Sequence, residues 1–168
     1  MLLDVQNLFL DNTAMTSWIV GNNVSVNAID LWGSQQSAGV PAAIPGPVGN
    51  ATANNNLVPK DFGRGNYNGV DFFAQINTTA TSGGAATLQL QIIMADAADL
   101  TTGQVILAET QVLALATLVA GYRFRLSLPP GGVTKRYLGV RAVVGTAVFT
   151  AGNITAGILW DQQTFPFP

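Results

Sequence analysis

The chain has 168 residues, of which 48% are hydrophobic and only 10% are charged, and its formal net charge at pH 7 is −2. This length fits one domain with a sizeable core, and the charge excludes the broad basic field of nonspecific nucleic-acid binders. A charged fraction far below the ~25% of ordinary soluble domains leaves two interpretations. Either other protein chains cover much of the surface, or the surface consists of neutral Asn, Gln, Thr, Ser and Gly.

Short segments of alternating hydrophobicity predict β-strands along most of the chain. In chain order they cover residues 2–10, 24–31, 70–78, 85–94, 104–109, 122–128, 136–144 and 153–161. Turns rich in Gly, Pro and Asn separate them, and helix is limited to a turn or two, at residues 96–100 or 109–118. About eight short antiparallel strands predict an all-β fold, a jelly-roll-like β-sandwich with a long inserted loop and extended termini.

The alternation also predicts which side chains face the core. In residues 85–94 (AATLQLQIIM), Leu, Ile and Met alternate with Thr and Gln, so one face is buried. In residues 122–128, Arg123 and Arg125 occupy the outward face. In residues 136–144, Leu138, Val140, Ala142 and Val144 form the inward set, and Arg141 lies on the opposite face.

The segment Gly33–Asn56 interrupts the series of strands. It contains three prolines, no charged residue and no sustained apolar period. A loop this long within a compact domain is uncommon and is usually functional or disordered. Two interpretations are open: a surface loop, or an extended arm that lies on a partner. The arm's candidate contacts are small apolar and proline side chains, namely Val40, Pro41, Ile44, Pro45 and Pro47.

The segment Gln162–Pro168 (QQTFPFP) is similar in kind. Phe165 and Phe167, separated by proline, make an extended segment with two aromatic anchors. Exposed aromatic side chains at such a position are unfavourable unless they dock, so we expect them to contact the core of the protein or a neighbour. The expected organisation is one sandwich domain over residues 1–168, with an inserted arm at 33–56 and a C-terminal tail at 162–168.

Histidine and cysteine are absent. Their absence removes the commonest general base and metal ligand, the serine triad and thiol or disulfide chemistry. Among nine scattered acidic residues only Asp96 and Asp99 are close, beside a turn, where aspartates more often cap turns than form a glycosidase pair. Gly63 and Gly65 precede a strand-like run rather than the helix that a phosphate loop requires. We therefore predict no enzymatic activity, no cofactor and no metal site.

A membrane span is not expected. The longest nearly apolar run, residues 112–120, is much shorter than the ~20 residues of a spanning helix. The start, MLLDVQNLFLDN, contains Asp4 and has no basic residue before its apolar stretch, so it does not predict a secretion signal.

An ordered set of segments resembles the capsid cement (decoration) proteins of short-tailed tailed bacteriophages. The segments are MLLDVQNLFLDNTAMT, SVNAIDLWG, DFGRG, LQLQIIMADAADL, LPPGGVTKRYLGVRAVVG and FTAGNITAGILWD, and together they cover most of the chain. Residues 33–56 and the apolar tail are additions to the family's pattern. The resemblance implies a jelly-roll-like virion protein, made in the host cytoplasm, that binds the outside of the capsid and stabilises the shell. Its implied partners are the major capsid protein and other copies of itself, as a homodimer or homotrimer, without direct contact to nucleic acid.

Within this resemblance the candidate contacts are the inserted arm, the tail and four arginines. Arginine suits bidentate pairing with carboxylates at interfaces, although each could equally be a solvated arginine on a strand face. The four are Arg123, Arg125, Arg136 and Arg141.

The alternative function is a carbohydrate-binding jelly-roll module of a phage tail or fibre. Trp18 and Trp32, with the Asn-rich segment, would then stack on sugar rings and hydrogen-bond to them. For Tyr137, Trp32 and Trp160 we expect core packing rather than partner contact.

Overall fold

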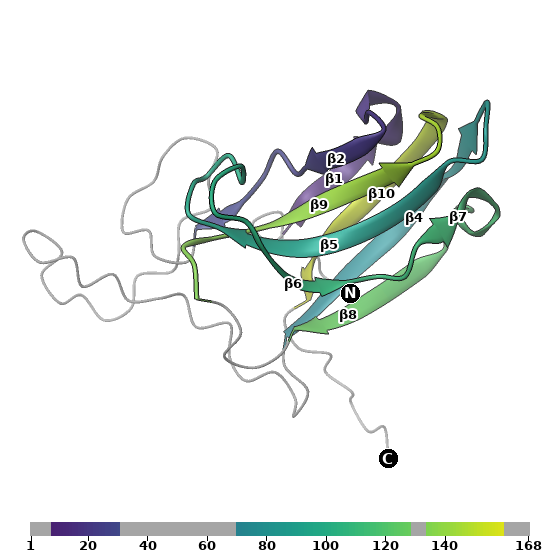
Figure 1. Ribbon diagram of the computed structural model, residues 1–168. Coiled ribbons are helices and arrows are strands. Elements are labelled where there is room, and N and C mark those ends of the chain that lie inside the picture. Colours follow the sequence, from purple (N-terminus) through teal and green to yellow (C-terminus); the bar gives the residue numbers. More distant parts are fainter. Residues whose placement is uncertain (1–7, 31–69, 129–133, 160–168) are drawn as a thin grey trace, which may run out of the picture.

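The computed structural model describes residues 8–30, 70–128 and 134–159. Within these residues, ten strands form two antiparallel sheets that pack face to face (Figure 1). The first sheet has the order β1-β10-β4-β8, with β1 at Leu8–Ala14, β10 at Phe149–Leu159, β4 at Val70–Ser82 and β8 at Arg123–Leu128.

The second sheet has the order β2-β9-β5-β6. These strands cover Gly21–Val24, Tyr137–Gly145, Thr87–Ala95 and Val105–Glu109; β3 (Ile29–Asp30) also pairs with β9, and β7 (Leu113–Ala114) also pairs with β5. Two single-turn 3-10 helices, η2 (Met15–Ser17) and η3 (Leu115–Thr117), lie in the connections. No helix in these described ranges has the length and apolar character to span a membrane.

Strands near the start of the described chain pair with strands near its end, and the strands between them pair in turn. β1 pairs with β10, β2 and β3 with β9, β4 with β8, and β5 with β6 and β7. If β2 with β3, and β6 with β7, each count as one interrupted edge strand, this is the eight-strand jelly-roll arrangement. The predicted fold class is confirmed.

The core lies between the two sheets and follows the predicted alternation. The four inward side chains of β9 and those of β5 are at most 5% exposed. Phe72 and Ile76 of β4 reach them from the opposite sheet and are fully buried. On β8 the outward Arg123 and Arg125 are exposed, as predicted.

Three expected elements differ from those observed. The first strand, expected at residues 2–10, continues to Ala14, and residues 2–7 of the expected strand lie outside the described part. The strand expected at 24–31 is divided into β2 and β3, because Ser25 is buried and its hydroxyl accepts the N–H of Val140 and donates to the carbonyl of Asn27. Residues 149–152, which lie between the expected strands 136–144 and 153–161, belong to β10 and include an irregularity in its pairing with β4.

A second, smaller apolar cluster lies on the outer face of the second sheet. It is formed by Ile93 and Ala95 of β5 with Ala28 and Leu100, and Tyr137 packs against it. The connection between β5 and β6 therefore covers part of a face that alternation assigns to solvent. Tyr137 packs as expected.

Candidate interaction surfaces

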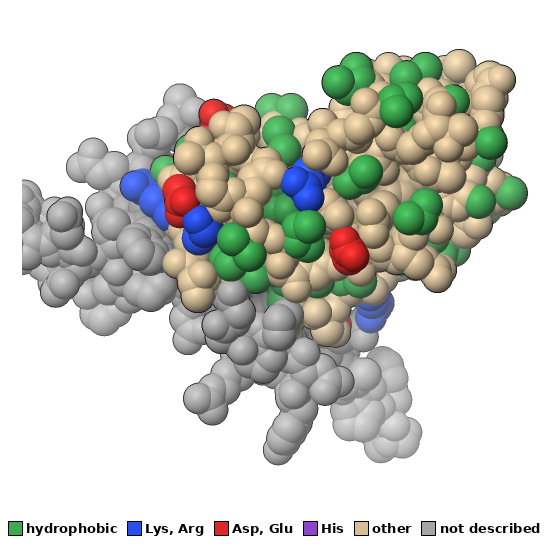
Figure 2. All heavy atoms as spheres, in the orientation of Figure 1, with side chains coloured by type: hydrophobic (Ala, Val, Ile, Leu, Met, Phe, Trp, Pro, Cys, Tyr) green, Lys and Arg blue, Asp and Glu red, His purple; other side chains and the backbone are tan. Residues whose placement is uncertain are grey.

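One end of the sandwich is formed by four connections without a charged residue. They are residues 15–20, 83–86, 110–122 and 146–148. Strand register brings them together: Gly21 pairs with Val144, Thr87 pairs with both Gly145 and Ala114, and Phe149 pairs with Ser82. They lie at the right of Figure 1, and in Figure 2 this end shows only hydrophobic and neutral atoms. We call this surface the uncharged end.

The uncharged end also exposes aliphatic side chains. Among the described residues eight large hydrophobic side chains are exposed, and five of them lie here: Ile19, Val20, Val112, Val119 and Val148. Ile19 is 67% exposed and Val112 is 60% exposed. Single exposed aliphatics are ordinary, but several on one surface without charge indicate an interaction site. Sequence reasoning missed this site, although the absence of charge in all four connections was visible.

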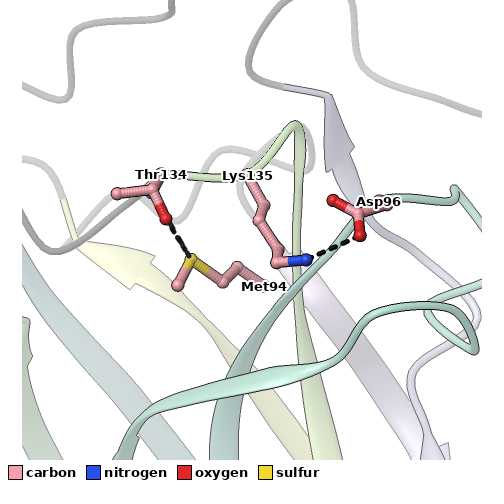
Figure 3. Close-up of polar contacts among 4 residues, drawn as sticks. All are labelled: Met94, Asp96, Thr134 and Lys135. Atoms are coloured by element: carbon pink, nitrogen blue, oxygen red, sulfur yellow. Dashed lines mark hydrogen bonds and ion pairs between the residues drawn. The ribbon is translucent and has the colours of Figure 1, made fainter.

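The opposite end carries charge, and the inserted arm and tail leave the sandwich there. Asp30 and Val70, which flank residues 31–69, and Leu159, which precedes the tail, lie at this end. Nearby, the Lys135 ammonium is 2.6 Å from the carboxylate of Asp96 (Figure 3). We call this the charged end.

Thr134 and Arg136 flank Lys135 at this end. The Thr134 hydroxyl lies 3.6 Å from the sulfur of Met94 (Figure 3). The guanidinium of Arg136 lies over the ring of Tyr137, 5.0 Å from its centroid, within the range of a cation–π contact.

The two neighbouring aspartates hold the β5–β6 connection. The Asp99 carboxylate accepts the backbone N–H of Thr101 at 3.0 Å. This bond, with a second from the Thr101 hydroxyl, holds the pKa of Asp99 below its ordinary value. Asp99 thus caps a turn, as expected, whereas Asp96 forms an ion pair. Across the residues that the structure describes, no three acidic side chains gather as metal ligands would.

The four predicted arginines do not form one patch. Arg123 and Arg125 lie on the outer face of the first sheet, where Arg123 donates to Gln75 at 2.9 Å. Arg141 lies on the outer face of the second sheet, and Arg136 at the charged end. The predicted contacts of the arm (Val40, Pro41, Ile44, Pro45, Pro47) and of the tail (Phe165, Phe167) lie outside the described residues.

Arg141 is held by a polar network across β9, β5 and β6. Its Nε donates to Gln91 at 2.7 Å and its Nη1 to Gln104 at 2.6 Å. Gln91, which is 7% exposed, in turn donates to the Glu109 carboxylate at 2.8 Å. The half-buried guanidinium of Arg141 therefore joins β9 to β5 and to the residue that precedes β6 through hydrogen bonds, which is a structural role.

Arg141→Leu is therefore expected to lower the free energy of unfolding by about 1–3 kcal/mol, because it removes the charged donor to the side-chain oxygen of the nearly buried Gln91. Urea denaturation monitored by tryptophan fluorescence measures the change. Arg125→Leu is the matched control, since the exposed Arg125 has no hydrogen bond or ion pair with another described residue, and it should change stability by less than about 0.5 kcal/mol. Equal effects of the two substitutions would contradict a structural role for the network.

Trp18 does not have the position that a carbohydrate site requires. It is 7% exposed and packs in the main core with Met15, so it offers no face for stacking on a sugar. The expectation that Trp18 lines a sugar groove is wrong, because the turn of η2 directs this side chain inward. Trp32 and Trp160 lie outside the described residues.

Comparison with known proteins relates the chain to one family. The sequence model of the Bbp16 family matches residues 14–158. A comparison with curated proteins finds no match. Because the family match covers β2 to β9 in full, the last residue of β1 and all but the last residue of β10, the chain belongs to the phage-related Bbp16 family.

Proposed function

We propose that this protein is a capsid cement (decoration) protein, a structural virion component that binds the outside of a phage head and bridges major capsid protein subunits. Membership of the Bbp16 family supports the phage setting. The observation that carries the proposal is the uncharged end with its five exposed aliphatic side chains. Such a surface favours contact with a protein that remains bound, because no ion loses its hydration there.

The expected energy of this contact explains why more than one site is needed. Fully burying an aliphatic side chain contributes about 1.5–3 kcal/mol, so five half-exposed ones contribute on the order of 5 kcal/mol. Association itself costs about 4–15 kcal/mol in lost translational and rotational freedom. The uncharged end alone therefore binds weakly, and tight attachment requires a second contact.

The charged end is where the second contact belongs in this proposal. The inserted arm and the tail both leave the sandwich there, at the end opposite the five aliphatics. A molecule attached at both ends links two neighbours, which is what a cement protein does. Repetition around a closed lattice then makes detachment cooperative, because the second contact of each bound copy is intramolecular.

The partners in this proposal are the major capsid protein and other copies of the chain, as a homodimer or homotrimer. Direct binding to nucleic acid, catalysis and a cofactor are not part of it. Copies on a lattice pair isologously or form a ring about a local axis.

Binding to heads tests the proposal. Purified protein added to heads that lack it is expected to appear as added density on the outer surface in a particle reconstruction, and to raise the temperature at which the heads release DNA. Replacing residues 33–56 with a short Gly-Ser link should leave the fold intact and lower the occupancy. Absence of the full-length protein from the heads at saturating concentration would refute the cement function.

A further inference from the structure

The four outer edges of the two sheets differ in how they are protected against a further strand. On the first sheet, β1 is irregular, with register shifts and a positive φ of 45° at Asn12, and β8 carries two exposed arginines. On the second sheet, β2 and β3 are short and interrupted. Bulges, charges and short length all discourage strand addition.

The β6 edge is also short and has one register irregularity in its pairing with β5, but it lacks the basic side chains that protect β8. Its sequence, VILAE, contains neither a basic residue nor proline, and within the described ranges 8–30, 70–128 and 134–159 its only strand neighbour is β5. Val105 and Ile106 are 41% and 43% exposed. Its acidic residue, Glu109, is at the end of the strand and accepts a hydrogen bond from Gln91. An edge with exposed aliphatic side chains and neither a basic residue nor proline can act as a template for pairing with another chain.

The core of the sandwich is also partly exposed to solvent beside β6. β6 and β8 lie next to each other across the two sheets, and the inward apolar side chains there, Leu107, Phe124 and Leu126, are only half-buried. At the other side of the sandwich the corresponding side chains of β1, Phe9 and Leu10, are 1% and 4% exposed. We call the half-buried strip between β6 and β8 the seam.

We propose that the β6 edge of one copy binds the C-terminal segment of a second copy, residues 162–168, as an added antiparallel strand whose Phe165 and Phe167 fill the seam. In the sequence TFPFP the phenylalanines have backbone N–H groups and the prolines do not. If the phenylalanine N–H groups point to β6, each proline nitrogen points to solvent, where an edge strand tolerates it. The two phenyl rings then lie on one face, as the side chains of Phe124 and Leu126 do along the seam.

Strand direction favours a second copy over the chain's own tail. β10 ends at the charged end, where β6 begins, so the chain's own tail would run parallel to β6, and parallel pairing is less stable. Antiparallel pairing in the same molecule would require the tail to cross about 10–15 Å to β6, follow its length of about 17 Å and return. The nine residues 160–168 span at most about 30 Å, which is too short.

This inference concerns the copy-to-copy contact of the proposed function, and its test uses the isolated full-length protein, so it can fail while head binding holds. Sedimentation velocity over a range of concentrations should show self-association of the full chain. A chain that ends at Asp161 and the edge variant Ile106→Pro should each associate at least tenfold more weakly. Val26→Lys, at a 93% exposed residue between β2 and β3, serves as the control and should associate like the wild type.

Mixing the two defective chains gives the decisive result. The tail-deleted chain retains an intact β6 edge and the edge variant retains an intact tail, so their mixture should form a one-to-one complex at concentrations where each alone is monomeric. Circular dichroism and thermal unfolding confirm that each chain is folded. A full chain that stays monomeric, a tail-deleted chain that associates normally, or a folded pair that does not complement would each overturn the proposal.

Discussion

Replacing Ile19 and Val119 together by aspartate is expected to remove most of the protein's binding to phage heads while leaving it folded. Both side chains are exposed at the uncharged end, at 67% and 47%, so the substitutions remove no core contact. In the bound state, however, two carboxylates would be buried without partners, which costs several kcal/mol. A loss of about 2.7 kcal/mol is a 100-fold weakening, and we expect at least that. Quantitative co-sedimentation with heads measures it.

Val26→Asp is the matched control for this double variant. Val26 is 93% exposed, but it lies between β2 and β3, at the side of the second sheet rather than at the uncharged end. It should bind heads like the wild type and unfold at a similar temperature. If the double variant also bound normally, the uncharged end would not be the attachment surface, and the arm and tail would have to supply the whole contact.

The elements that could be predicted from sequence are those in which local alternation and burial agree. On β9, inward Leu138 and Val144 are buried because the strand lies in the middle of its sheet, with β5 on one side and β2 and β3 on the other. The interrupted edge at Ser25 could not be predicted in this way. Its cause is a pair of hydrogen bonds to Val140, 115 residues away, and periodicity contains no information on such contacts.

The interaction surfaces could not be predicted from sequence either, because they depend on contacts between residues far apart in the chain. The basic stretch around Arg136 and Arg141 is conspicuous in the sequence, yet the fold separates the two residues and ties the guanidinium of Arg141 into a network with Gln91 and Gln104. The uncharged end is inconspicuous, because its members come from four connections distributed over residues 15–148. Only the pairing of strands far apart in the chain brings Ile19 and Val119 to the same end. Whether the arginines contact a partner stays a prediction.

Gly152→Ala is expected to be among the most destabilising single substitutions in the sandwich, lowering the free energy of unfolding by about 2–6 kcal/mol. Gly152 lies inside β10 with φ of +126°, where a side chain introduces strain of about 1–3 kcal/mol. A Cβ there would also lie 2.9 Å from the Cα of Ala80 and 3.1 Å from the Met15 sulfur. Backbone cannot move aside as a flexible side chain can, so overpacking adds about 1–3 kcal/mol.

Gly21→Ala separates the two causes, because Gly21 has a similar φ of +113° but no atom within 4 Å of the added Cβ. Gly21→Ala should lower the free energy of unfolding only by the part due to backbone strain. Urea denaturation of both variants measures the difference. Gly152 lies at the irregularity where residues 151–153 of β10 oppose residues 78–81 of β4. Equal losses in the two variants would show that the close approach to Ala80 is not what requires glycine in β10.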